Sequence, residues 1–281
     1  MPPPPPLYPV TSDIPPTSPY HYSPTPTRRR NGGILGGLAA AAAAAFAYGK
    51  WVLLLIFKIP AAGTLISLVV SFGGYALFYG PWFAVALLTM IFVHEMGHVV
   101  EIRRQGMQAT APIFIPFVGA AIFQRSHPTD PIKQAQIGIA GPIAGTLGAT
   151  AALVLFGSTH WVGFLIWAYY GFLINLFNLI PFGMLDGGWI LAPVSKWVQV
   201  AGLAVLVGLF IAQLVSPLVI ILFIIGIPMV IQRFRDRALD AHLTSGPAAA
   251  RYAMGAAWLA LVVYLAFAMY QADTMLNAFV R

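Results

Sequence analysis

Two histidines and a glutamate stand close together in the segment HEMGH, as His94, Glu95 and His98. A spacing of four residues places both imidazoles on one face of a helix, where their nitrogens can reach a single metal ion. Glu95 is suited to take a proton from a zinc-activated water and to pass it to a leaving amine. Zinc lowers the pKa of such a water to about 7. The pattern therefore predicts one hydrolytic zinc site per chain, with Glu95 as the general base.

A third ligand must come from elsewhere, because a catalytic zinc usually has three protein ligands and one open position. The chain has no cysteine, so histidine and carboxylate residues remain. Asp186 lies in an apolar region, where an ionised carboxylate costs at least a few kcal/mol and needs a partner or a function. Pro181 and the neighbouring glycines break a helix there and let the carboxylate turn inward. We predict Asp186 as the third ligand; a turn residue in Leu-Asp-Gly-Gly is the alternative.

The composition predicts that these residues sit in a membrane. Of 281 residues, 59% are hydrophobic and only 8% are charged, against roughly 25% charged residues in soluble domains. A crossing needs about 20 mostly apolar residues, so the chain has room for six or seven. The net charge of +7 is spread between apolar segments, which indicates membrane topology and not nucleic-acid binding.

The expected fold is an all-α polytopic membrane protein. Seven apolar segments are candidate crossings, at about residues 61–79, 82–100, 136–156, 162–180, 198–214, 217–231 and 252–270. Residues 106–123 are also apolar, but Pro112 and Pro116 disfavour a helix and the run is too short to span. A re-entrant extended or β-like loop near the active site fits this segment better.

The chain divides into four predicted regions. Residues 1–32 hold eleven of the 23 prolines and are expected to be a disordered cytoplasmic tail. Residues 33–59 are expected to form an interfacial or weak membrane helix, although Ala45-Phe46-Ala47 imitates a signal-peptide cleavage site. Residues 60–235 are the predicted catalytic core, and residues 236–281 are a C-terminal extension with one further crossing.

The lysines and arginines predict one orientation. With the tail in the cytoplasm, only Arg281 falls on the outer side, and the outer turns around Pro81, Thr159 and Pro217 carry no basic residue. The expected protein is therefore multi-pass with a cytoplasmic N-terminus. The absence of an evident organelle signal and the compact core favour a prokaryotic plasma membrane.

Three segments together resemble the site-2 protease family of intramembrane zinc metalloproteases. They are HEMGH at 94–98, GPIAG at 141–145 and NLIPFGMLDGG at 178–188, and the resemblance runs from about residue 50 to 235. It implies that His94, His98 and Asp186 bind zinc and that Glu95 is the base. The family's asparagine corresponds to Asn178, whose amide would stabilise the developing oxyanion or position the substrate.

Several residues in or near these segments also have structural interpretations. Hydrogen bonding between helices is the alternative for Asn178 and is our interpretation of Asn175. We interpret Gly141, Gly145 and Gly148 as a close helix-packing face.

The resemblance implies a transmembrane protein substrate, often an anti-sigma factor or a membrane-tethered transcription factor. Its helix must unwind before water can attack, and residues 111–123 offer an extended edge for strand addition. Two other functions stay open. One is a membrane transporter for a metal or protons. The other is a scaffold that sequesters membrane proteins without cutting them.

Overall fold

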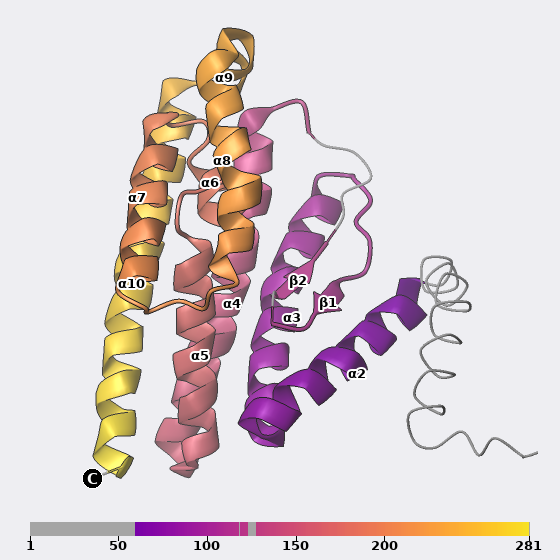
Figure 1. Cartoon of the computed structure of the whole chain (residues 1–281), viewed down its shortest axis with the longest axis vertical. Helices are drawn as coiled ribbons and strands as arrows, with labels where there is room; N and C mark the ends of the chain where they lie inside the picture. The colour runs from indigo at the N-terminus through magenta and orange to yellow at the C-terminus, as the bar shows by residue number, and fades with distance from the viewer. Residues whose placement is uncertain (1–59, 118, 123–127, 281) are drawn as a thin grey trace, which may run out of the picture. The chain divides into compact units, whose positions relative to one another are not determined.

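The computed structural model of the chain describes residues 60–117, 119–122 and 128–280 (Figure 1). All of these residues belong to one unit, residues 54–281. The predicted tail and the predicted interfacial region, residues 1–32 and 33–59, lie outside the described residues.

Four helices of the described part are long and apolar enough to cross a bilayer. They are α2 (Pro60–Tyr79), α3 (Pro81–Arg104), α4 (Pro131–Thr159) and α10 (Ala248–Val280). At 1.5 Å per residue, 20 residues extend about 30 Å, which matches the hydrocarbon core of a membrane. A mostly helical membrane protein is therefore the architecture that the composition predicted.

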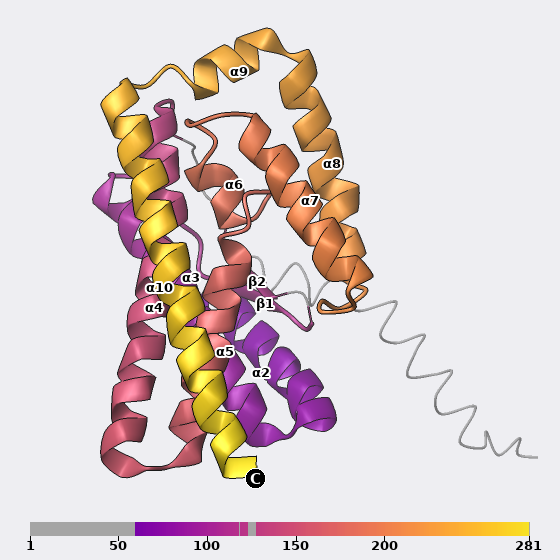
Figure 2. The same ribbon diagram turned by 90° about the vertical axis from the view of Figure 1, so that its left-hand side faces the viewer.

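Three further apolar helices are shorter. They are α5 (Val162–Asn178), α7 (Trp197–Ile211) and α8 (Val219–Arg235), of 17, 15 and 17 residues. Helices α7 and α8 form an antiparallel pair whose turn lies about level with the middle of α10 (Figures 1 and 2). The count of seven crossings includes all three and remains a prediction. Two short helices, α6 (Asp186–Ile190) and α9 (Arg237–Leu243), complete the helical elements described.

The segment predicted to be extended contains a small antiparallel hairpin. Strand β1 (Ile113–Ile115) pairs with β2 (Gly119–Ala121), with Phe114 opposite Ala120. Side chains of α2 bind the hairpin, since the Ser67 hydroxyl accepts from Phe114 N at 3.0 Å and Tyr75 OH accepts from Phe117 N at 3.0 Å. The hairpin thus lies against α2.

The main hydrophobic core lies between α4, α5 and α10, which run side by side in Figures 1 and 2. Phe172 and Leu165 of α5 are fully buried there against Leu265 of α10. Helix α3 packs against α4 and also contacts α5. A Cβ at Gly97 of α3 would overlap the Ala140 carbonyl of α4, so only glycine permits this close approach. The contact fixes the helix that carries the two histidines.

Candidate metal centre

Helix α3 carries His94, Glu95 and His98 into the interior. Their exposed fractions are 3%, 8% and 9%, although all three have polar side chains. Helical spacing places the two imidazoles on one face, where they meet edge to face with ring centroids 4.9 Å apart. Buried polar groups need partners, so the neighbouring elements must supply them.

The connection from α5 to α6 brings Asp186 to the histidines. Pro181 lacks the backbone N–H that would continue α5, and Gly183 adopts a left-handed conformation with φ 54°. A side chain at Gly183 would also meet the backbone of Gly226 in α8. The chain therefore turns sharply here, and Asp186 becomes the first residue of α6.

The three predicted ligand residues converge. Asp186 Oδ2 lies 3.0 Å from His94 Nε2, and Asp186 Oδ1 lies 3.4 Å from His98 Nε2. The two Nε2 atoms are 3.2 Å apart. One ligand atom from each residue lies within 4.8 Å of the others, close enough for a single ion to touch all three.

The partners of the other ring nitrogens fix which way each imidazole faces. His98 Nδ1 lies 2.8 Å from the Ile137 carbonyl, which only accepts hydrogen bonds, so Nδ1 carries the proton. His94 Nδ1 lies 2.8 Å from Asn175 Oδ1, and the Asn175 amide nitrogen donates to the Gly171 carbonyl at 2.6 Å. Because Nδ1 is the donor in each ring, Nε2 is the nitrogen that faces the centre, and it is the atom that would bind a metal when the proton on it is absent.

This donor set fits a cation. Two imidazole Nε2 atoms face a carboxylate, and the buried Asp186 Oδ2 has only His94 Nε2, at 3.0 Å, as a polar neighbour among the described residues. Electron-pair donors crowded at about 3 Å repel one another unless a cation lies between them. Two imidazoles and one carboxylate are a known ligand set for catalytic zinc, so the cluster is compatible with that ion.

Gly141 of the GPIAG segment belongs to this centre. A Cβ at Gly141 would overlap the His98 ring, so α4 leaves room for the imidazole by having no side chain there. The sequence interpretation of Gly141 as a packing residue is therefore incomplete, because the group that it packs against is a predicted ligand.

A cavity of about 470 Å³ opens beside the centre. His94, Glu95 and Asn178 line it, together with Phe117, Gly119 and Ala120 of the hairpin region and mostly apolar residues of α5, α8 and the α7–α8 connection. The predicted general base and one predicted ligand therefore face the same space.

The two asparagines of α5 have separate environments. Asn178, predicted from the family resemblance, lines the cavity and donates to the Ile174 carbonyl at 3.1 Å. Asn175, interpreted from sequence as a residue that bonds between helices, contacts His94 directly. Residues three positions apart lie on nearly the same face of a helix, so the sequence alone could not show which of the two asparagines reaches His94.

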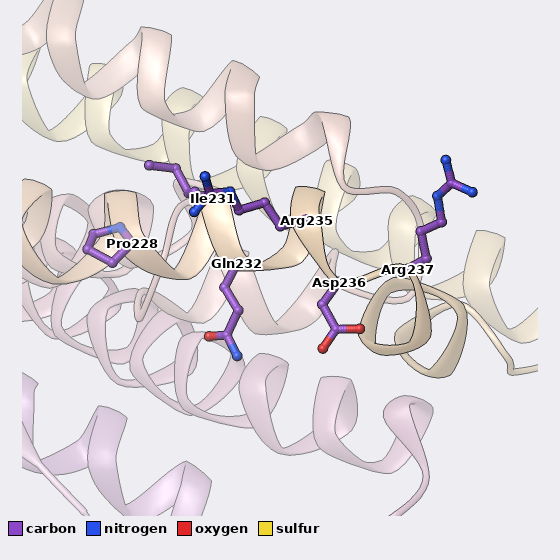
Figure 3. Close-up of a pocket in the computed structure, with 6 residues that line it drawn as sticks. All are labelled: Pro228, Ile231, Gln232, Arg235, Asp236 and Arg237. Atoms are coloured by element: carbon purple, nitrogen blue, oxygen red, sulfur yellow. The ribbon is translucent and has the colours of Figure 1, made fainter.

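A larger cavity of about 830 Å³ lies along the end of α8 and the start of α9 (Figure 3). Gln232 and Asp236 lie on one side of α8 in that view, while Arg235 and Arg237 point elsewhere. Polar side chains that bind one ligand converge on it, and these diverge. The smaller cavity beside His94 is therefore the candidate site.

Helices and site together indicate a membrane protein with a buried His-His-Asp cluster that is compatible with metal binding. Comparison with protein families adds one finding: residues 82–162 match the model of peptidase family M50, the site-2 protease family. This stretch contains α3, with its two histidines, and α4, with Gly141. The match confirms the resemblance drawn from the sequence motifs, and the family indicates a metallopeptidase. A search of curated proteins finds no match.

Proposed function

We propose that this chain is an intramembrane zinc metalloprotease that hydrolyses peptide bonds of transmembrane proteins. The observation that carries the proposal is the cluster of His94, His98 and Asp186, with Glu95 beside it, inside a bundle of apolar helices. Buried ionisable groups at this depth are expensive unless they perform a function. The match to peptidase family M50 supports the same reaction class.

His94, His98 and Asp186 would hold the zinc ion. When bound, zinc supplies Lewis-acid polarisation of the scissile carbonyl and makes water a nucleophile near neutral pH. The Glu95 carboxylate accepts the proton from the attacking water and then donates it to the departing amine. The Asn178 amide keeps one N–H beyond the bond to Ile174, and it donates this hydrogen to the carbonyl oxygen as negative charge develops.

The hairpin supports a binding mode for the unwound substrate. Phe114 N of β1 donates to Ser67, so it does not bond β2, and the pair Phe114–Ala120 is of the non-hydrogen-bonded type. The N–H and C=O of Ala120 therefore point away from β1. Because Ala120 also lines the cavity, an extended substrate segment pairs with β2 by strand addition.

Topology and regional organisation belong to the same proposal. We place the N-terminus in the cytoplasm and count seven crossings of a prokaryotic plasma membrane. The orientation agrees with the basic residues at the ends of two described helices, Arg103 and Arg104 of α3 and Arg233 and Arg235 of α8. Residues 1–32 act as a cytoplasmic tail, residues 60–235 as the catalytic core, and residues 236–281 as an extension.

The test uses full-length protein purified in detergent, with a helical transmembrane substrate and a zinc count. Wild type should cut the substrate and carry about one zinc per chain. Glu95→Gln should keep the zinc, and its rate of cleavage should fall at least about 100-fold, because only the base is removed. Cleavage that survives in Glu95→Gln would contradict the mechanism. Wild type that binds no zinc would contradict the proposal itself, and a transporter or scaffold would then be the better description.

A further inference from the structure

Asn175 is a fully buried amide outside the segment that matches the family. Both of its polar atoms are used: Oδ1 accepts from His94 Nδ1 at 2.8 Å, and Nδ2 donates to the Gly171 carbonyl at 2.6 Å. Since the carbonyl fixes which end of the amide carries hydrogens, Oδ1 is the end that faces His94. The amide is thereby locked in one orientation.

We propose that Asn175 is a positioning residue that holds His94 in the tautomer and rotation needed to bind zinc. This inference rests on the proposed function, since it assigns the partner of one proposed ligand. The Nδ1 hydrogen bond makes Nε2 the lone-pair nitrogen of the neutral ring and aims it at Asp186 and His98. Partners of this kind orient metal-bound histidines and raise their basicity.

The two histidines differ in what holds them. His98 is held by a backbone carbonyl, that of Ile137, which no substitution removes. His94 is held by a side chain, so its orientation depends on the identity of one residue. Substitution at position 175 therefore affects one ligand and leaves the other in place.

Gly145 of α4 is the second part of this arrangement. A Cβ at Gly145 would overlap all three terminal atoms of the Asn175 amide. Glycine is disfavoured inside helices, so helix formation gives no reason for it here. The geometry assigns Gly145 the role of admitting the amide, one helical turn beyond Gly141, which admits the His98 ring.

The first experiment measures zinc affinity by competition with a chelator in the full-length protein. Asn175→Leu, which keeps the volume and loses the acceptor, should bind zinc about 10- to 100-fold more weakly. Asn175→Asp restores an acceptor for His94 Nδ1 and should bind more tightly than Asn175→Leu. Asn178→Leu is the matched control on the same helix: its zinc affinity should equal that of wild type while its cleavage falls.

The second experiment is a double-mutant cycle on the same affinity. Gly145→Ala should weaken zinc binding when Asn175 is present, because the new methyl displaces the amide. In an Asn175→Ala background the amide is gone, so Gly145→Ala should cost little more. Gly148→Ala is the control, because its Cβ would meet Val93 Cγ1 at 3.1 Å and would otherwise make only ordinary contacts with Val93 Cβ and Met90 Sδ, away from the Asn175 amide.

The outcomes separate this inference from the proposed function. Two results would overturn the role of Asn175 and leave the protease proposal standing. One is that wild type and Asn175→Leu bind zinc with the same affinity. The other is that the effects of Gly145→Ala and Asn175→Ala on zinc affinity are fully additive. Failure of wild type to bind zinc would overturn both. The Co²⁺-substituted protein gives a further readout, since a displaced His94 changes its visible absorption spectrum in Asn175→Leu and not in Asn178→Leu.

Discussion

At the scale of single residues, the candidate centre depends as much on missing side chains as on present ones. His98 fills the space above Gly141, and the amide of Asn175 fills the space above Gly145. Interiors are packed so closely that one added methyl group is felt by its neighbours. The two glycines therefore determine where a ligand and its partner can lie.

Gly141→Ala should weaken zinc binding strongly, by at least about 10-fold, because its methyl group occupies the place of the His98 ring. Zinc affinity measured by chelator competition checks this. Gly73→Ala in α2, where a Cβ would meet no atom within 4 Å, should bind zinc like wild type. Equal affinity of Gly141→Ala and wild type would show that His98 does not need this space.

At the scale of elements, the extended hairpin makes the most specific prediction about the substrate. Ala120→Pro removes an outward N–H of β2 and leaves the bonds to β1 in place. Cleavage should therefore fall about 10-fold or more, while the zinc content stays unchanged. Ala121 pairs with Ile113 inside the hairpin, and Ala121→Pro should disturb the hairpin itself. Full activity of Ala120→Pro would exclude strand addition at this edge.

Helix α10 lies beyond the segment that matches the family, yet it contacts the connection that carries Asp186. The Trp258 indole N–H donates to the Leu179 carbonyl at 2.8 Å, just where α5 ends. A helix end leaves carbonyls without partners inside the helix, and this bond satisfies one of them. The extension, which the sequence left without a role, thus supports the site.

Trp258→Phe should destabilise the protein by about 1–3 kcal/mol, because a buried carbonyl loses its donor while the aromatic packing largely remains. The transition temperature in detergent should fall, and zinc should dissociate faster because the Asp186 connection is less restrained. Trp197→Phe, at a side chain that is 65% exposed, should leave both quantities near wild type. A Trp258→Phe protein with wild-type stability would show that the bond contributes nothing.

Some features of the candidate site were predictable from the sequence and others were not. The four-residue spacing of His94 and His98 and the helix-breaking Pro181 are local signals, so the sequence was sufficient to nominate the ligands. The bonds of Asn175 to His94 and of Trp258 to Leu179 join positions 81 and 79 residues apart. No local pattern encodes such partners, because they arise only when α3, α5 and α10 pack together.

At the scale of the whole molecule, an ionic cluster joins the region after α6 to α8 and α9. Arg233, almost fully buried, donates to Asp240 at 3.0 Å and to the Ala192 carbonyl at 2.7 Å, and Lys196 approaches Asp240 at 3.1 Å. Burial raises the pKa of Asp240, but the hydrogen bonds from Lys196 and Arg233 outweigh it and hold the pKa below its ordinary value. The ionised carboxylate therefore stabilises the fold.

This cluster predicts a pH dependence of stability. A carboxyl whose pKa is lower in the folded state contributes its full stabilisation above its unfolded pKa, about 3.9, and loses it as the pH falls through the folded value. Asp240→Asn should thus destabilise the protein by about 1–3 kcal/mol at pH 7. Unfolding measured against pH should show the gap between variant and wild type constant down to about pH 4 and shrinking below it. A gap that does not depend on pH would contradict this role.

The candidate metal ligands lie on α3 and on α6, so they are synthesised at different times. Asp186 follows His94 by 92 residues, and the α4–α5 hairpin lies between them. At about 5–20 residues per second, the ribosome needs roughly 5–20 s to add this stretch. The centre cannot close until that hairpin has entered the membrane and α6 has followed. A nascent chain of this proposed protease therefore lacks the complete set of candidate ligands until α6 has been made, so any cleavage must wait until most of the bundle has been synthesised.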